Sequence, residues 1–238
     1  RALLEEMASD LAYGIASLRT RAEREAAEEA RLASEAQRRE LGERLQQALV
    51  ATIQAIAVTI EKRDPYTAGH QQRVAELADA LAAELGMEDD RREGLRLAAT
   101  IHDIGKISIP AEILNRPGRL SETEFQLIKG HPQEGYEIVA GVEFPWPVAD
   151  MVVQHHERLD GSGYPEGLVG EAVVWEARIL AVADVVEAMA SHRPYRPALP
   201  LQAALDEIRA GRGTRYDERV VDACLTLFEG KGFTWEEA

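Results

Sequence analysis

The stretch His102-Asp103-Ile104-Gly105-Lys106 decides how the rest of this chain must fold. A histidine and an aspartate stand side by side, a glycine ends the helix that carries them, and a lysine follows. Neighbouring side chains on a helix point about 100° apart. His102 and Asp103 can therefore hold one metal ion from two sides, or Asp103 can bridge two ions.

Other residues of metal-binding type lie far from this stretch: His70, His131, His155, His156 and Asp184. Asp184 falls in an apolar run, where an ionised carboxylate is costly to bury unless a cation compensates it. Imidazoles and carboxylates without thiolates suit Fe(II), Mn(II) or Zn(II). The sequence therefore predicts a metal site to which the chain folds back.

Some of these residues also have an ordinary interpretation. His70 can be a surface or core histidine, His131 can be a loop histidine beside Pro132, and Asp184 can be a buried, hydrogen-bonded aspartate. The adjacent pair His155-His156 is harder to explain in this way. Taken together, the set favours a metal site.

Composition limits the class of protein. Of the 238 residues, 45% are hydrophobic but only 5% aromatic, which favours a helical core of small aliphatic side chains over a β-sandwich. The net charge of −15 argues against binding to duplex nucleic acid or to an anionic membrane. No apolar run of about 18 residues and no signal peptide is found, so we expect a cytoplasmic protein. Because Cys224 is the single cysteine, the chain has no disulfide framework. The first residue is Arg1 and not methionine, so we expect the sequence to be a fragment of a longer protein.

The spacing of apolar residues along the chain predicts an all-α protein. Residues 1–63 contain no proline, and apolar residues recur at spacings of three and four at both ends of this segment, which predicts a long coiled-coil helix. A single solvated helix is the alternative. Further helices are predicted over 70–85, from 89 or 90 through His102, 121–141 with a break at Pro132, 148–157, 174–191, 201–211 and 217–229. The first helix is predicted to stop or kink at Asp64-Pro65, and loops are predicted over 66–69, 109–118, 160–167 and around Pro194, Pro197 and Pro200.

Five ordered segments resemble the HD superfamily of metal-dependent phosphohydrolases, and specifically its HD-GYP branch. They are RDPYTAGHQQRV (63–74), HDIGKISIPAEIL (102–114), KGHPQEG (129–135), HHERLDGSGYPEGL (155–168) and ARILAVADVVEAMASHRPYR (177–196). The resemblance implies a helical domain that hydrolyses cyclic di-GMP to pGpG or GMP.

The resemblance also implies a role for individual residues. The first metal would be held by His70, His102, Asp103 and Asp184, and the second by His131, His155 and His156, with Asp103 as the bridge. Asp103 and Lys106 would be catalytic. Substrate contacts would come from Lys106, Gly163, Tyr164, Pro165, Arg193 and Arg196.

Two positions depart from the family pattern. Tyr66 stands where some members have a glutamate that helps to hold a third metal, so we expect two divalent ions, with Fe or Mn favoured over Zn or Ni. Glu187 stands where an aspartate is common, one helical turn after Asp184, and the sequence leaves its reach open.

The expected domains are a helix over 1–24 that resembles the closing helix of a GAF sensor domain, a coiled-coil linker over 25–54, and an HD-GYP domain over 55–238. The expected partners are cyclic di-GMP and a second copy of the chain, bound through the N-terminal helix. Two alternatives stay open: hydrolysis of another cyclic dinucleotide such as 3′,3′-cGAMP, and a non-catalytic adaptor that binds cyclic di-GMP or a diguanylate cyclase.

Overall fold

The computed structural model describes residues 2–61, 69–116, 118, 120–191 and 198–235. Within these ranges every regular element is helical, and extended pairing is limited to two isolated bridges, Asp160 with Val169 and Arg212 with Tyr216. The prediction of an all-α fold is confirmed. Tyr66, Arg193 and Arg196, and most of the predicted loops that contain them, lie outside the described residues.

The long N-terminal helix α1 spans Ala2–Glu61. The chain divides into two compact units, Arg1–Ala51 and Thr52–Ala238. In the first unit, ion pairs one helical turn apart, such as Arg21 with Glu25, support an otherwise exposed helix. In the second unit, the last turns of α1 bury Ile53, Ala57 and Ile60 in the hydrophobic core.

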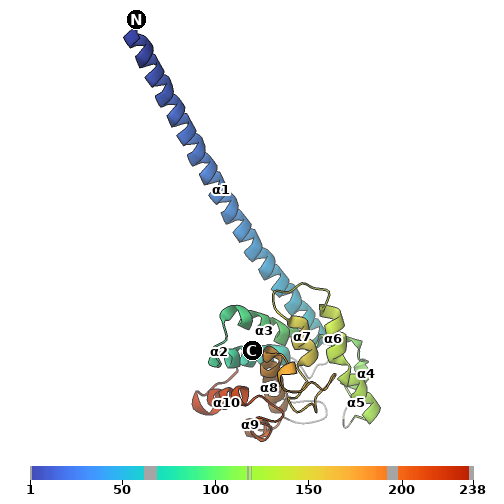
Figure 1. Ribbon diagram of the computed structural model, residues 1–238. Helices are drawn as coiled ribbons and strands as arrows, with labels where there is room; N and C mark the ends of the chain where they lie inside the picture. The colour runs from blue at the N-terminus through green and yellow to red at the C-terminus, as the bar shows by residue number, and fades with distance from the viewer. Residues whose placement is uncertain (1, 62–68, 117, 119, 192–197, 236–238) are drawn as a thin grey trace. The chain divides into compact units, whose positions relative to one another are not determined.

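The second unit is a bundle around α8, Trp175–Ala190 (Figure 1). Helix α8 packs against α2 (His70–Glu84), α3 (Asp89–Ile101), α7 (Val148–Gln154), α9 (Leu201–Ala210) and α10 (Glu218–Leu225). Ile179, Leu180 and Val182 of α8 are fully buried in the core. A helix surrounded by others is apolar on nearly all sides, which is why 174–191 is the most apolar helical pattern in the sequence.

Several boundaries differ from the predicted ones. After α3, the 3₁₀ turn η2 (Ile104–Ser108) precedes the predicted loop over 109–118, and the short helix α4 (Ala111–Leu114) lies within that loop. The predicted capping box starts α5 (Glu122–Lys129), since Ser121 and Glu124 cap each other's backbone N–H. The predicted break is real: a separate helix, α6 (His131–Val139), begins with Pro132 in its first turn. The short turns η3 (Gly170–Ala172) and η4 (Thr226–Gly230) complete the described elements.

The ends of four helices carry the predicted histidine ligands. His70 begins α2 and His131 begins α6, whereas His102 and His155 directly follow the last residues of α3 and α7. Helix α7 therefore stops earlier than the predicted limit at 157, and His155 and His156 follow its last turn. Placement at helix ends lets side chains from four directions reach one point. Among the described residues, no helix is both long enough and apolar enough to span a membrane.

Candidate metal centre

The first group of predicted ligands consists of His70, His102 and Asp184. Their ligand atoms all lie within 4.8 Å of one another, and all three residues are buried. Asp184 Oδ1 lies 3.3 Å from His70 Nε2 and 3.8 Å from His102 Nε2. Three different helices contribute to this group, so it exists only in the folded domain.

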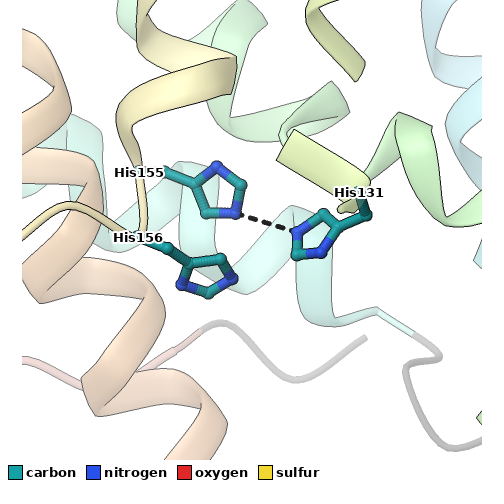
Figure 2. A group of neighbouring side chains, drawn as sticks. All are labelled: His131, His155 and His156. Atoms are coloured by element: carbon teal, nitrogen blue, oxygen red, sulfur yellow. Dashed lines mark hydrogen bonds between the residues drawn. The ribbon is translucent and has the colours of Figure 1, made fainter. Parts of the chain in front are cut away.

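The second group consists of His131, His155 and His156, whose ligand atoms also lie within 4.8 Å of one another. Figure 2 shows the three rings turned toward a common point, with the Nε2 atoms of His131 and His155 3.3 Å apart. Two imidazole nitrogens at this distance need a proton or a cation between them, because two lone pairs would otherwise face each other.

Asp103 lies between the two groups. Its Oδ1 is 3.2 Å from His131 Nε2, whereas its Oδ2 is 3.6 Å from His102 Nε2 and 3.8 Å from His70 Nε2. Each oxygen thus faces a different group, which is the arrangement that a bridging carboxylate requires.

The backbone fixes which ring nitrogen is available in three of the histidines. The Nδ1 atoms of His102, His131 and His155 lie 2.7, 2.7 and 2.6 Å from the backbone oxygens of Ala99, Ile128 and Val152. A carbonyl oxygen can only accept, so each Nδ1 carries the proton and each neutral ring presents an unprotonated Nε2. Among the described residues, the Nε2 of His102 is a buried nitrogen without a hydrogen-bond partner. A metal ion fits this unmet lone pair.

The charges of the site also suit cations. Burial lowers the pKa of His102, and it lowers the pKa of His155 and of His156 well below the usual value, so these rings stay neutral. Burial alone would raise the pKa of Asp103, but the Lys106 ammonium beside it, the strongest of the opposing influences, holds that pKa well below its ordinary range. Neutral imidazoles beside ionised, buried carboxylates are the protonation states that metal binding needs.

Glu187 reaches the site, which answers the question that the sequence left open. Its buried carboxylate contacts Nδ1 of His70, accepts from Arg73 Nε at 2.7 Å, and accepts from Ser191 Oγ at 2.6 Å. Burial opposes its ionisation, but His70, Ser191 and Arg73 lower the pKa of Glu187 to about 2. Glu187 therefore orients the His70 ring so that Nε2 points at Asp184.

The predicted substrate contacts that the structure describes lie beside the two groups. Lys106 Nζ is 2.6 Å from Asp103 Oδ2. The Tyr164 ring lies against His156, with the centroids 4.7 Å apart and the planes at 34°. Lys129 Nζ is 5.4 Å from the Tyr164 centroid. Contact of Lys106, Gly163, Tyr164 or Pro165 with a substrate stays a prediction.

Sequence reasoning missed Glu157 and Lys129. Glu157 has a buried carboxylate and follows His155-His156 directly, at the start of a glycine-rich loop. The available signal was its place in the sequence, directly between the pair His155-His156 and a glycine-rich loop whose backbone N–H groups can donate to a carboxylate. Lys129 begins the segment KGHPQEG (129–135), but no sequence pattern links it to Tyr164, which it approaches only through the fold.

In the part of the chain that the structure describes, histidines at helix ends meet Asp103 and Asp184 inside a helical bundle, which defines a helical domain with a candidate metal centre. The chain belongs to the HD-domain family, whose model matches residues 54–220.

The relatives and solved structures agree with this assignment. The chain is 45% identical over 176 residues to the cyclic di-GMP phosphodiesterase response regulator RpfG of Xanthomonas campestris pv. campestris, covering 73% of this chain and 47% of that protein. It is 38% identical over 174 residues to the 3′3′-cGAMP-specific phosphodiesterase 1 of Vibrio cholerae, covering 71% and 40%. The structure of Bd1817, an HDG"Y"P protein from Bdellovibrio bacteriovorus, matches with a TM-score of 0.57 and 25% identity, over 68% of this chain and 52% of that one.

The predicted family and fold are thus confirmed, and the relatives include cyclic di-GMP phosphodiesterases of HD-GYP type. The chain spans about half or less of the length of the curated relatives it matches. None of the comparisons bears on the GAF-like helix predicted over 1–24, which stays a prediction.

Proposed function

We propose that this chain is a metal-dependent phosphodiesterase that hydrolyses cyclic di-GMP to pGpG or GMP. The observation that carries the proposal is the pair of buried histidine groups with Asp103 between them and Lys106 beside it. The cyclic di-GMP phosphodiesterases among the relatives support the choice of substrate. The 3′3′-cGAMP phosphodiesterases among them keep that dinucleotide as the second candidate.

The protein's own residues would prepare the reaction. His70, His102 and Asp184 would hold one divalent ion, His131, His155 and His156 would hold the other, and Asp103 would bind both. Two such ions supply Lewis acidity and activate water at neutral pH. Lys106 would place its ammonium where charge grows on the phosphoryl oxygens, and Lys106 or water would protonate the leaving ribose oxygen. The ligand set, without thiolate, favours Fe or Mn, with Zn or Ni as alternatives.

Removal of the metal is expected to abolish hydrolysis. After treatment with a chelator, the protein should leave cyclic di-GMP intact, and anaerobic addition of Fe(II) or Mn(II) should restore release of pGpG or GMP. Metal analysis of the restored protein should give two ions per chain. Chromatography of the nucleotides measures the activity.

Parallel assays separate the alternatives. Faster turnover of 3′,3′-cGAMP than of cyclic di-GMP would change the substrate and keep the chemistry. Tight calorimetric binding of cyclic di-GMP without product over hours, in protein shown to hold both ions, would favour an adaptor over an enzyme. A chelated protein that still cleaves cyclic di-GMP would contradict the proposed metal mechanism.

We also propose a division of the chain into three parts: residues 1–24 are the closing helix of a sensor domain, 25–54 are a coiled-coil linker, and 55–238 are the phosphohydrolase domain. Two copies of the chain would pair through the coiled coil. Exposed apolar side chains within this linker support the coiled coil, among them Leu32, Leu41, Leu45 and Leu49. Pairing two such helices would bury this face, at about 1.5–3 kcal/mol for each large side chain that becomes fully buried.

The double substitution Leu41→Ser and Leu45→Ser is expected to convert a dimer into a monomer. Light scattering during size-exclusion chromatography measures the mass. The control Gln47→Ser and Gln54→Ser changes two exposed polar residues of the same helix and should leave the mass unchanged. A wild-type protein that is monomeric at high micromolar concentration would contradict the coiled coil.

A further inference from the structure

The carboxylate of Glu157 lies in the interior, and three backbone N–H groups donate hydrogen bonds to it. Glu157 is only 2% exposed. Oε1 accepts from the N–H groups of Glu166 at 2.8 Å and Gly167 at 3.1 Å, and Oε2 accepts from Leu168 at 3.0 Å. Bonds from N–H groups to an ionised carboxylate are about twice as strong as bonds between neutral groups. Three consecutive N–H groups thus tie one end of the glycine-rich loop to the residue next to His156.

A second set of contacts holds residues 163–164 of the loop against the backbone of residues 156–158. The Tyr164 N–H donates to the backbone oxygen of His156 at 3.3 Å. A Cβ added to Gly163 would lie 2.4 Å from both Glu157 Cα and Arg158 N, closer than real side chains come. Glycine at 163 therefore lets the loop lie directly on the backbone at Glu157 and Arg158.

The consequence is a fixed place for the Tyr164 ring. The ring lies 4.7 Å from the His156 ring between centroids, and the Lys129 ammonium lies 5.4 Å from the Tyr164 centroid. Tyr164 is half-buried, so part of its surface stays accessible beside the second histidine group. An aromatic face at this place suits stacking with a base or ribose of a nucleotide.

We propose that Glu157 is a positioning residue for the nucleotide: by binding the N–H groups of residues 166–168, it holds Tyr164 beside His156 in the orientation that binds a cyclic dinucleotide. Without this anchor, the substrate would have to order the loop, which costs conformational entropy. Preorganisation of this kind strengthens binding without new contacts. The inference rests on the proposed function, because it assumes a nucleotide substrate.

Two substrates separate positioning from metal binding. Cyclic di-GMP needs both the metal centre and the loop, whereas bis(p-nitrophenyl) phosphate is a small phosphodiester without bases that needs only the metal centre. In Glu157→Gln, one acceptor oxygen becomes an NH2 group that faces N–H donors, so the loop loses its anchor while the side chain keeps its size. KM for cyclic di-GMP is expected to rise about 10–100-fold, since bonds to a charged group are worth about 1.5–3 kcal/mol. Metal content and cleavage of bis(p-nitrophenyl) phosphate should change less than about threefold, because the Glu157 carboxylate binds backbone N–H groups of the loop and not the side chain of a metal ligand.

Glu157→Asp keeps the charge and should restore part of the affinity, and it serves as the second variant if Glu157→Gln does not fold. Glu171→Gln is the matched control, because its side chain is 97% exposed on the segment that follows the loop. An unchanged KM in folded Glu157→Gln would overturn the positioning role alone. An equal loss of metal or of bis(p-nitrophenyl) phosphate cleavage would overturn it too, since Glu157 would then support the metal centre. Wild-type protein that cleaves bis(p-nitrophenyl) phosphate but neither binds nor cleaves cyclic di-GMP would overturn the proposed function, and this inference with it.

Discussion

Asp103→Asn is expected to lower kcat for cyclic di-GMP by at least about 10³-fold, which corresponds to ~4 kcal/mol of transition-state stabilisation. The reason is geometric. One oxygen of Asp103 is 3.2 Å from His131 Nε2, and the other is 3.6 Å from His102 Nε2, so a single carboxylate serves both groups. Asparagine has nearly the same shape but no charge, and its NH2 group cannot bind a metal. The substitution would also leave the Lys106 ammonium, now 2.6 Å from Asp103, without this carboxylate partner.

Metal analysis is the second measurement on this variant, and it should give fewer than two ions per chain. Asp150→Asn is the matched control: the same chemical change in the first turn of α7, at an exposed residue. It should cost no more than about 1 kcal/mol of stability, from the lost interaction with the helix dipole, and leave kcat unchanged. A folded Asp103→Asn protein with two ions and wild-type kcat would contradict the bridging role.

The candidate ligands could be picked out from the sequence because most of them carry a local signal. His102 and Asp103 precede a glycine at a helix end, Asp184 interrupts an apolar run, and His155-His156 is an unusual pair. Such signals need no knowledge of the tertiary structure, since burial of a charged or polar side chain needs compensation wherever it occurs. The fold brings together His70, His102 and Asp184, and also His131, His155 and His156; Asp103 lies close to both His102 and His155. The division of these residues between two ions stays a prediction.

The residues that orient the site could not be predicted in the same way. Glu187 meets His70 across 117 positions of sequence, and Lys129 meets Tyr164 across the bundle. These distances depend on how helices pack, which periodicity does not specify. The ends of helices were also uncertain: α7 stops at Gln154 because the Nδ1 proton of His155 goes to the Val152 oxygen and the chain then turns toward the loop.

Gly105, in the stretch that decides the fold, shows how closely two parts of the site approach each other. A Cβ at Gly105 would lie 2.0 Å from the His131 backbone oxygen and 2.5 Å from the Gly135 N. Both atoms belong to α6, so the turn η2 and the first turns of α6 are in direct backbone contact. The glycine therefore sets the separation between Asp103, which precedes η2, and His131, which begins α6. A backbone carbonyl cannot move aside as the end of a flexible side chain can, and any larger residue must push the two segments apart.

Gly105→Ala is accordingly expected to destabilise the protein by about 3 kcal/mol, the upper part of the usual range for overpacking, which corresponds to a fall in melting temperature of roughly 6–12 °C. It should also displace His131 from Asp103, so the folded variant should bind one ion instead of two and lose most of its hydrolysis of cyclic di-GMP. Differential scanning calorimetry and metal analysis measure the two effects. Gly141→Ala is the control, because a Cβ there would meet no atom within 4 Å, and its φ is not in the left-handed region. A Gly105→Ala protein with two ions and an unchanged melting temperature would mean that α6 can shift without disturbing the second histidine group, and the close contact would then have no role in holding that group in place.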